Sequence, residues 1–229
     1  MKKNILITGA AGNLGQATVE KFLKEGHRVI AAVSPGRKLD RMNGDIVTVE
    51  TDLTKEKIVE EVVKKIVAAY QSIDAALLLV GGYDGGDIFK TDGASLKKMY
   101  SLNFETAYNV ARPVFMQMMR QPLGGRIIFV GARPALNVED GKNSLAYALS
   151  KSLVFKLADY LNAEGASKNV TSTVIVPSIV DTPANRSAMP KANFTSWVTP
   201  DTIADVMAFV ISENAGSLRE TVLKVYGNA

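Results

Sequence analysis

Short apolar stretches alternate along this chain with longer segments in which apolar residues recur at helical spacing. The short stretches predict β-strands at residues 4–7, 28–33, 46–49, 75–80, 126–130, 172–176 and 222–226. The longer segments predict helices near residues 14–25, 95–120, 145–164 and 201–212, and one more whose inner side carries Ile58, Val62, Val63, Ile66 and Val67. This alternation indicates an α/β fold: a doubly wound sheet of seven parallel strands with helices on both faces.

The chain shows no linker, repeat or low-complexity stretch that would divide it. We therefore expect residues 1–229 to form a single domain, which suits a composition of 47% hydrophobic and 22% charged residues. In doubly wound sheets, ligands bind beyond the carboxyl ends of the strands. The loops at those ends span residues 8–15, 34–37, 81–93, 131–143 and 177–199. The last loop is long for a connection, and its part at about 181–199 is predicted to be a substrate lid.

Composition excludes several kinds of site. The chain has no cysteine, which excludes disulfides and thiolate metal ligands, and its only histidine, His27, cannot form a multi-histidine metal site or a histidine-based triad. Its 27 basic and 23 acidic residues are interspersed, so we expect no nucleic-acid partner. No apolar run approaches the roughly 18 residues of a membrane span, and the apolar start is too short for a signal peptide. We expect a cytoplasmic protein with no metal and no membrane partner.

The first strand is followed by a glycine-rich turn and then by a helix, in the segment I-L-I-T-G-A-A-G-N-L-G. Gly9, Gly12 and Gly15 permit a tight turn and a close approach of the backbone to a ligand. The helix that starts near Asn13 and Leu14 offers N–H groups to the phosphates of a dinucleotide. The alternative is a tight turn that binds no ligand. In this order of elements, the motif predicts a Rossmann-type fold that binds NAD or NADP.

The loop after the second strand distinguishes NADP from NAD, because an acidic residue there binds the ribose 2′-hydroxyl. Here Ser34 stands near that place, and Arg37 and Lys38 follow, which favours NADP through an ion pair with its 2′-phosphate. The alternative is that both cations are ordinary loop charges. After the third strand, Asp52 suits a hydrogen bond to adenine; its alternative role is to cap the next helix, for which Thr54 is also suited.

A tyrosine and a lysine four residues apart, Tyr147 and Lys151 in Y-A-L-S-K, share one side of a predicted helix. The ammonium next to the phenol favours the phenolate, so it is expected to lower the tyrosine pKa from its ordinary value of about 10. Such a tyrosine exchanges a proton with a substrate near neutral pH. The alternative is an exposed helix pair, which the nucleotide motifs elsewhere in the chain disfavour.

Together, T-G-A-A-G-N-L-G, Asp52, Asn103 and Y-A-L-S-K resemble the short-chain dehydrogenase/reductase family, from residue 4 to about 226. The resemblance implies an NAD(P)-dependent oxidoreductase that forms a homodimer through two long helices. It implies a catalytic set of Tyr147, Lys151 and Asn103, in which Asn103 either holds a proton-relaying water or satisfies backbone groups. The cofactor-binding residues that it implies are Gly9, Gly12, Asn13, Leu14, Gly15, Ser34, Arg37, Asp52, Leu53, Gly81, Gly82, Pro177, Val180 and Thr182.

Two departures from the family pattern indicate one branch of it. The N-N-A-G stretch of the family is replaced by V-G-G-Y-D-G-G, and Pro134 stands where a substrate-binding serine usually precedes the tyrosine. Both features, with the segment D-T-P-A-N-R-S-A-M-P-K-A-N-F-T-S-W, resemble dihydropteridine reductases, which reduce a quinonoid pterin. The resemblance implies that Tyr83, Ala132, Arg186 and Trp197 line the substrate site, although Trp197 suits packing within the lid equally well.

The missing serine separates the candidate functions. Losing a hydrogen-bond donor to a developing oxyanion costs roughly 3–4 kcal/mol. That cost is severe for a ketone and smaller for a quinonoid ring, whose charge is spread by conjugation. We therefore expect hydride transfer to a planar, pterin-like substrate, with Tyr147 as the proton donor. The alternatives are a reductase of another carbonyl or imine, in which Ser144 or water replaces the lost donor, and a non-catalytic NADP-binding sensor.

Overall fold

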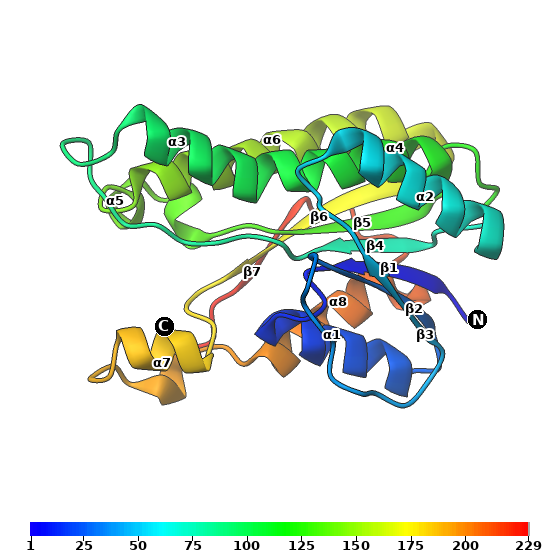
Figure 1. Cartoon of the computed structure of the whole chain (residues 1–229), viewed down its shortest axis with the longest axis horizontal. Coiled ribbons are helices and arrows are strands. Elements are labelled where there is room, and N and C mark those ends of the chain that lie inside the picture. Colours follow the sequence, from blue (N-terminus) through cyan, green and yellow to red (C-terminus); the bar gives the residue numbers. More distant parts are fainter. Residues whose placement is uncertain (229) are drawn as a thin grey trace.

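A sheet of seven parallel strands forms the centre of the structure (Figure 1). The computed structural model describes residues 1–228. Its strands are Asn4–Thr8 (β1), Arg28–Val33 (β2), Ile46–Glu50 (β3), Ala75–Leu78 (β4), Gly125–Val130 (β5), Val170–Pro177 (β6) and Val222–Val225 (β7). Their order across the sheet is β3-β2-β1-β4-β5-β6-β7. The chain first adds β2 and β3 on one side of β1 and then returns to add β4 to β7 on the other side. This topology confirms the predicted doubly wound, Rossmann-type α/β fold and creates the crevice where such sheets bind ligands.

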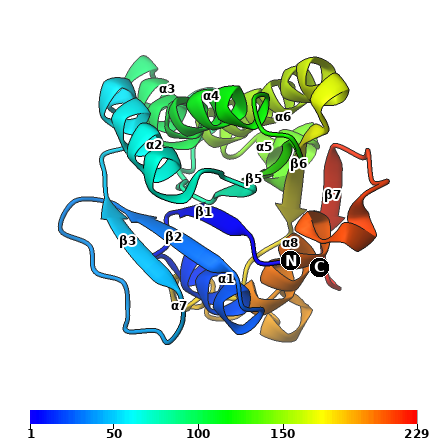
Figure 2. The same cartoon turned by 90° about the vertical axis from the view of Figure 1, so that its right-hand side faces the viewer.

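Helices cover both faces of this sheet, so the molecule has three layers (Figure 2). One face is covered by Asn13–Lys24 (α1) and Pro200–Ile211 (α8), and the other by Glu56–Tyr70 (α2), Thr106–Met118 (α4) and Leu145–Gly165 (α6). The helices Gly93–Tyr100 (α3), Val138–Gly141 (α5) and Pro183–Ala188 (α7) lie toward the end of the molecule that is on the left in Figure 1. The carboxyl ends of the strands, with the loops that carry most of the predicted site residues, face this end.

Each face of the sheet has its own apolar core. In β1, Ile5 and Ile7 pack in the cluster that includes α1 and α8, whereas Leu6 packs in the cluster that includes α2, α4 and α6. Successive side chains of a strand point to opposite faces, and here both faces are buried. The strands are therefore almost continuously apolar, which is why short apolar runs locate them in the sequence.

The apolar side of α2 differs from the predicted one. The helix buries Val59, Val63 and Ile66, which follow the i, i+4, i+7 spacing of one helical face. Ile58 lies at the margin of this face and is 46% exposed. The prediction that Ile58 lies on the inner side is therefore wrong, because the helix is rotated so that Val59 faces the sheet.

The helix predicted at residues 95–120 is divided into α3 and α4 by a π-helical turn, Ser101–Glu105. Such a turn widens the helix locally and is frequent at functional sites. Within it, the side chain of Asn103 is only 1% exposed. The wide turn thus buries a polar side chain at a place where helical periodicity gives no signal.

The predicted lid at 181–199 is part of the long connection between β6 and α8. It contains α7 and a 3₁₀ turn, Phe194–Ser196. A β-bridge between Val180 and Val198 closes its base.

Within residues 1–228, no helix combines the length and apolar character needed to cross a membrane, and no group of three His, Cys, Asp or Glu side chains is placed to hold a metal.

Candidate cofactor and active site

The glycine turn between β1 and α1 brings the backbone close to any bound ligand. Gly9 has a positive φ of 65°, and a Cβ on Gly15 would clash with the Gly9 carbonyl oxygen. A Cβ on Gly12 would have one neighbour, the Gly9 carbonyl oxygen at 3.3 Å. The space on the other sides of Gly12 is therefore open. The N–H groups of Asn13 and Leu14 belong to the first turn of α1, which contains no acidic side chain. This helix end offers hydrogen-bond donors to an anionic pyrophosphate.

The ends of β2 and β3 lie side by side, since Val33 pairs with Glu50 in the parallel register. After β2 the chain makes a turn in which the N–H of Arg37 donates to the Ser34 carbonyl over 3.0 Å. The Glu50 carboxylate accepts a hydrogen bond of 3.2 Å from the N–H of Gly36 in this turn. The sequence analysis missed this carboxylate, because it considered only the residues that directly follow β2. The position of Glu50 at the end of the adjacent strand was the available signal.

Asp52 follows β3 at the same edge of the sheet. Its carboxylate accepts hydrogen bonds from the hydroxyl and the N–H of Thr54, over 2.7 and 3.0 Å, and these bonds lower the pKa of the Asp52 carboxyl below its usual value. Helix α2 begins at Glu56, so its N-cap position is Lys55 and not Thr54. Neither Asp52 nor Thr54 therefore caps this helix. The carbonyl of Leu53 is held by the side chain of Asn109, over 2.9 Å.

Lys151 is buried in the middle of the site, with 5% of its surface exposed. Its ammonium donates a 2.8 Å hydrogen bond to the Val130 carbonyl at the end of β5. A Cβ on Gly81 would lie 3.0 Å from Lys151 Nζ and 2.8 Å from Asn103 Oδ1, so the loop after β4 packs directly on both side chains. Burial lowers the pKa of Lys151 to about 8.

Tyr147 lies one helical turn before Lys151 on α6, and the ring of Tyr83 packs against it edge-on, with 5.1 Å between the ring centres. Burial, and secondarily the neighbouring Tyr83, raise the pKa of Tyr147 to about 12. This direction is opposite to the predicted lowering. The reason is that burial, the larger of the two causes, disfavours the charged phenolate. Tyr147 is consequently a phenol at neutral pH.

Asn103 is held by three hydrogen-bonding groups. Its Oδ1 accepts from the N–H of Gly82 over 2.9 Å, and its Nδ2 donates to the Gly82 carbonyl over 3.1 Å and to the hydroxyl of Ser150 over 3.0 Å. Of the two predicted roles, these contacts match the second, in which the side chain satisfies backbone groups. Sequence reasoning missed Ser150, although this residue directly precedes Lys151 in the Y-A-L-S-K motif.

The segment after β6 connects the sheet to the lid. The hydroxyl of Thr182 accepts a hydrogen bond from the N–H of Asn185 and so caps α7. Pro177 ends the strand, and Val180 forms the bridge at the base of the lid. Ser178 donates a hydrogen bond to the Tyr226 carbonyl over 2.7 Å, which ties this segment to the residue that follows β7.

The residues predicted to contact substrate are not all brought together. Tyr83 lies against Tyr147 and remains 68% exposed, and Ala132 at the end of β5 is buried. Arg186 is instead engaged in a two-bond ion pair with Asp181, over 2.6 and 2.7 Å. Trp197 is 8% exposed and packs on Phe194, with 4.8 Å between the ring centres, so it lies in the packing of the lid.

Comparison with known families identifies the chain. The family model described as short chain dehydrogenase matches residues 3–193, which include the glycine turn, the π-turn and the Tyr147–Lys151 pair. This protein belongs to the short-chain dehydrogenase/reductase family. It is thus an oxidoreductase of a family that acts on small molecules with NAD or NADP as cofactor, as the sequence motifs predicted.

The relatives of this dehydrogenase/reductase differ in the share of their own length that the match covers. The oxidoreductase YuxG of Bacillus subtilis is 32% identical over 192 residues, which cover 78% of this chain but only 27% of YuxG. A dihydropteridine reductase of Dictyostelium discoideum is 30% identical over 220 residues, covering 95% of this chain and 90% of that enzyme. The structure of ElxO with NADP bound has a TM-score of 0.89 at 22% identity, covering 99% and 98% of the two chains, and this similarity shows the fold alone.

The residues of this short-chain dehydrogenase/reductase fit a nicotinamide dinucleotide. The open space beside Gly12 and the donors at the start of α1 suit its pyrophosphate. Asp52, whose Oδ1 accepts from Thr54, carries a second carboxylate oxygen suited to an adenine amino group. Lys151 has donors beyond the one that Val130 accepts, and these suit ribose hydroxyls.

The buried lysine predicts a distinctive pH dependence of stability. The pKa of Lys151 is about 8 in the folded protein and near 10.5 when unfolded. Unfolding therefore takes up a proton between these values, and stability must rise as pH increases from 8 to 10.5. Relative to Lys151→Met, the free energy of unfolding of the wild type should rise by about 3 kcal/mol across this window. Urea unfolding followed by circular dichroism at several pH values measures this difference.

Lys156→Met provides the control for this experiment, because Lys156 is an exposed lysine on the same helix. Its difference from the wild type should stay constant within error over the same pH range. A constant difference for Lys151→Met as well would contradict the burial of a lysine with a lowered pKa.

Proposed function

We propose that this protein is an NAD(P)H-dependent reductase of a planar, quinonoid substrate of the pterin type. The observation that carries the proposal is the placement of Tyr83, an exposed aromatic ring in a glycine-rich loop, directly against the proposed proton donor Tyr147. A flat heterocycle entering here would meet an aromatic ring and a phenol together. The similarity to the Dictyostelium dihydropteridine reductase over nearly the whole chain supports the same substrate class.

The proposed reaction adds one hydride and one proton to the substrate. When bound, the reduced nicotinamide supplies the hydride from its C4 atom. Tyr147 supplies the proton from its hydroxyl, which its raised pKa keeps protonated at neutral pH, and regains it from solvent. Lys151 stabilises the tyrosinate and binds the cofactor ribose, while Asn103 fixes the Gly81–Gly82 backbone against it.

The absent serine is consistent with this substrate class. Pro134 occupies the serine position within a 3₁₀ turn, and a proline offers no hydrogen-bond donor to a substrate oxygen. Ser144, the alternative donor, is 2% exposed at the start of α6. A quinonoid ring delocalises the charge that it gains, so it requires this donor less than a simple ketone does.

We further propose that residues 1–229 act as one functional domain and that residues 181–199 form its substrate lid. In this proposal, Trp197 and Phe194 give the lid its own apolar packing, since their rings are in contact. The ion pair of Arg186 with Asp181 and its position over the Phe194 ring, at 4.8 Å, hold α7 in the same unit. The face of α7 directed away from this packing would then cover the substrate.

For the cofactor, we propose a preference for NADP. Arg37 lies exposed in the turn that follows β2, and Ser34 leaves room for a 2′-phosphate. The Glu50 carboxylate accepts from the Gly36 N–H of the same turn, and the proposal places the Arg37 guanidinium, rather than this carboxylate, against the 2′-phosphate. One neighbour in fold, ElxO, holds NADP.

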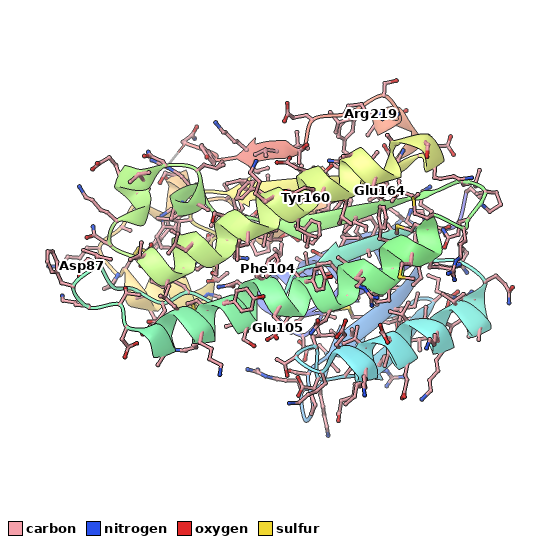
Figure 3. The ribbon with its side chains drawn as sticks, turned by 90° about the horizontal axis from the view of Figure 1, so that it is seen from above. Asp87, Phe104, Glu105, Tyr160, Glu164 and Arg219 are labelled. Carbon is pink, nitrogen blue, oxygen red and sulfur yellow. The ribbon has the colours of Figure 1, made fainter. Side chains whose placement is uncertain are left out.

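We also propose a homodimer that forms through α4 and α6. These helices run side by side on the outer face, where Phe104 and Tyr160 are visible (Figure 3). Phe104 is stacked between Tyr100 and Tyr108 along the helix, with ring centres 5.4 and 6.1 Å apart. The exposed large apolar side chains of α3, α4 and α6 are Leu96, Tyr100, Tyr108, Met116, Leu149, Leu153 and Tyr160. An apolar surface of this extent is typical of a protein–protein interface.

Oxidation of NADPH and NADH with quinonoid dihydropterin tests the proposed reaction. We expect the wild type to turn over and Tyr147→Phe to lose at least about a hundredfold in kcat, with cofactor affinity unchanged. The nicotinamide absorbance at 340 nm follows turnover, and nucleotide fluorescence follows binding. Turnover retained by Tyr147→Phe would remove this residue from the proton path, and nucleotide binding without turnover would favour the sensor alternative.

Replacing Arg37 tests the cofactor preference. Arg37→Ala should weaken NADPH binding by about ten- to a hundredfold, because a charge-assisted contact to the 2′-phosphate is lost. NADH binding should be unchanged, since NADH lacks that phosphate. Lys38→Ala, one residue further along the turn, is the matched control for a general loss of positive charge. Equal losses of NADPH and NADH affinity in Arg37→Ala would rule out the NADP assignment.

Light scattering coupled to gel filtration tests the dimer. The wild type should have twice the chain mass of 24.6 kDa at micromolar concentration. Tyr108→Glu and Tyr160→Glu should give monomers, because each places a charge within the apolar face of α4 and α6. Phe209→Glu, at an exposed apolar residue on the opposite face of the sheet, should leave the mass unchanged. A wild type with the mass of a single chain would contradict the proposed homodimer.

A further inference from the structure

Ser150 is a buried serine between the two residues of the Tyr147–Lys151 pair, and it is 3% exposed. Its hydroxyl donates to the Tyr147 carbonyl over 2.8 Å and accepts a hydrogen bond from Asn103 Nδ2 over 3.0 Å. One hydroxyl therefore joins the backbone of α6 to the π-turn between α3 and α4. Both its donor and its acceptor capacity are in use.

The contacts of Asn103 carry this connection on to the loop after β4. Asn103 binds both backbone groups of Gly82, and the preceding Gly81 fits closely between Asn103 Oδ1 and Lys151 Nζ. One residue beyond Gly82, the ring of Tyr83 lies on the ring of Tyr147. A closed path of contacts thus starts from the Tyr147 carbonyl, passes through Ser150, Asn103 and the loop, and returns to both Lys151 and the Tyr147 ring.

We propose that Ser150 is a positioning residue, which holds Asn103 and, through it, the Gly81–Tyr83 loop in register with the Tyr147–Lys151 pair. This inference deepens the proposed function and rests on it for the catalytic consequence. The loop is rich in glycine and has little rigidity of its own. Its position depends on the Asn103 amide, whose orientation requires an acceptor at Ser150. Without that acceptor, one Nδ2 hydrogen is left with only the weak acceptor Met99 Sδ, at 3.6 Å.

A second serine on the same helix separates this role from an ordinary helix contact. Ser152 also donates its hydroxyl to a carbonyl three residues earlier, that of Leu149, over 2.7 Å. The local bond is the same in kind, but Ser152 is more exposed and Asn103 donates to Ser150. Alanine at each position removes the same local bond, and only at position 150 does it also release Asn103.

The experiment compares Ser150→Ala with Ser152→Ala in two readouts. The first is an NMR titration of lysines labelled with ¹³C at Cε, in which Lys151→Met assigns the Lys151 signal; it requires no substrate. In Ser150→Ala, a loosened loop admits water, so the pKa of Lys151 should rise from about 8 toward its ordinary 10.5. The second is kcat, which should fall about tenfold or more while the Kd for the cofactor is unchanged. Ser152→Ala should match the wild type in both.

The outcomes separate this inference from the proposed function. A wild type without turnover refutes the reductase, and the lysine titration still decides the role of Ser150. Identical titrations of wild type and Ser150→Ala would overturn the inference, and so would equal shifts in Ser150→Ala and Ser152→Ala. If Ser150→Ala does not fold, Asn103→Leu removes the Nδ2 donor at similar size without adding a charge beside Lys151, and it should also raise the Lys151 pKa. A Lys151 pKa that stays at the wild-type value in this variant would likewise overturn the inference.

Discussion

The buried ammonium of Lys151 is the constraint on which the rest of the site depends. A lysine this far from water is expensive to charge, and the Val130 carbonyl offsets only part of that cost. Together with Asn103, the side chain leaves little room for a Cβ at Gly81. The close fit of the loop after β4 depends on this buried lysine, whereas Tyr147 stays a phenol because its own hydroxyl is buried.

Three distant parts of the chain meet around this lysine because of the sheet topology. In a parallel sheet, the carboxyl ends of β4, β5 and β6 all lie at one end, so the loop carrying Tyr83, the Val130 carbonyl and the segment after β6 all emerge at that end. The π-turn contributes Asn103 from the side, through the widened helix between α3 and α4. A site of this kind is positioned by regular elements and is completed by glycine-rich segments.

The two ends of the crevice differ in how their charges are arranged. At the cofactor end, Arg37 lies in a turn that Glu50 holds from the neighbouring strand. At the end where we propose that substrate binds, Arg186 is paired with Asp181, and the aromatic ring of Tyr83 is exposed. This arrangement suits the anionic cofactor and the flat, weakly charged substrate that we propose.

Sequence by itself determined where the strands lie along the chain, the glycine turn after the first strand, the place of Asp52 after the third and the position of Tyr147 and Lys151 on one helix, because these depend on local geometry and on spacing along one element. It could not give the neighbours of those residues. The contact of Glu50 with the turn after β2, the packing of Trp197 in the lid and the link from Ser150 to Asn103 join segments far apart in the chain. The raised pKa of Tyr147 likewise depends on burial, which only tertiary packing decides.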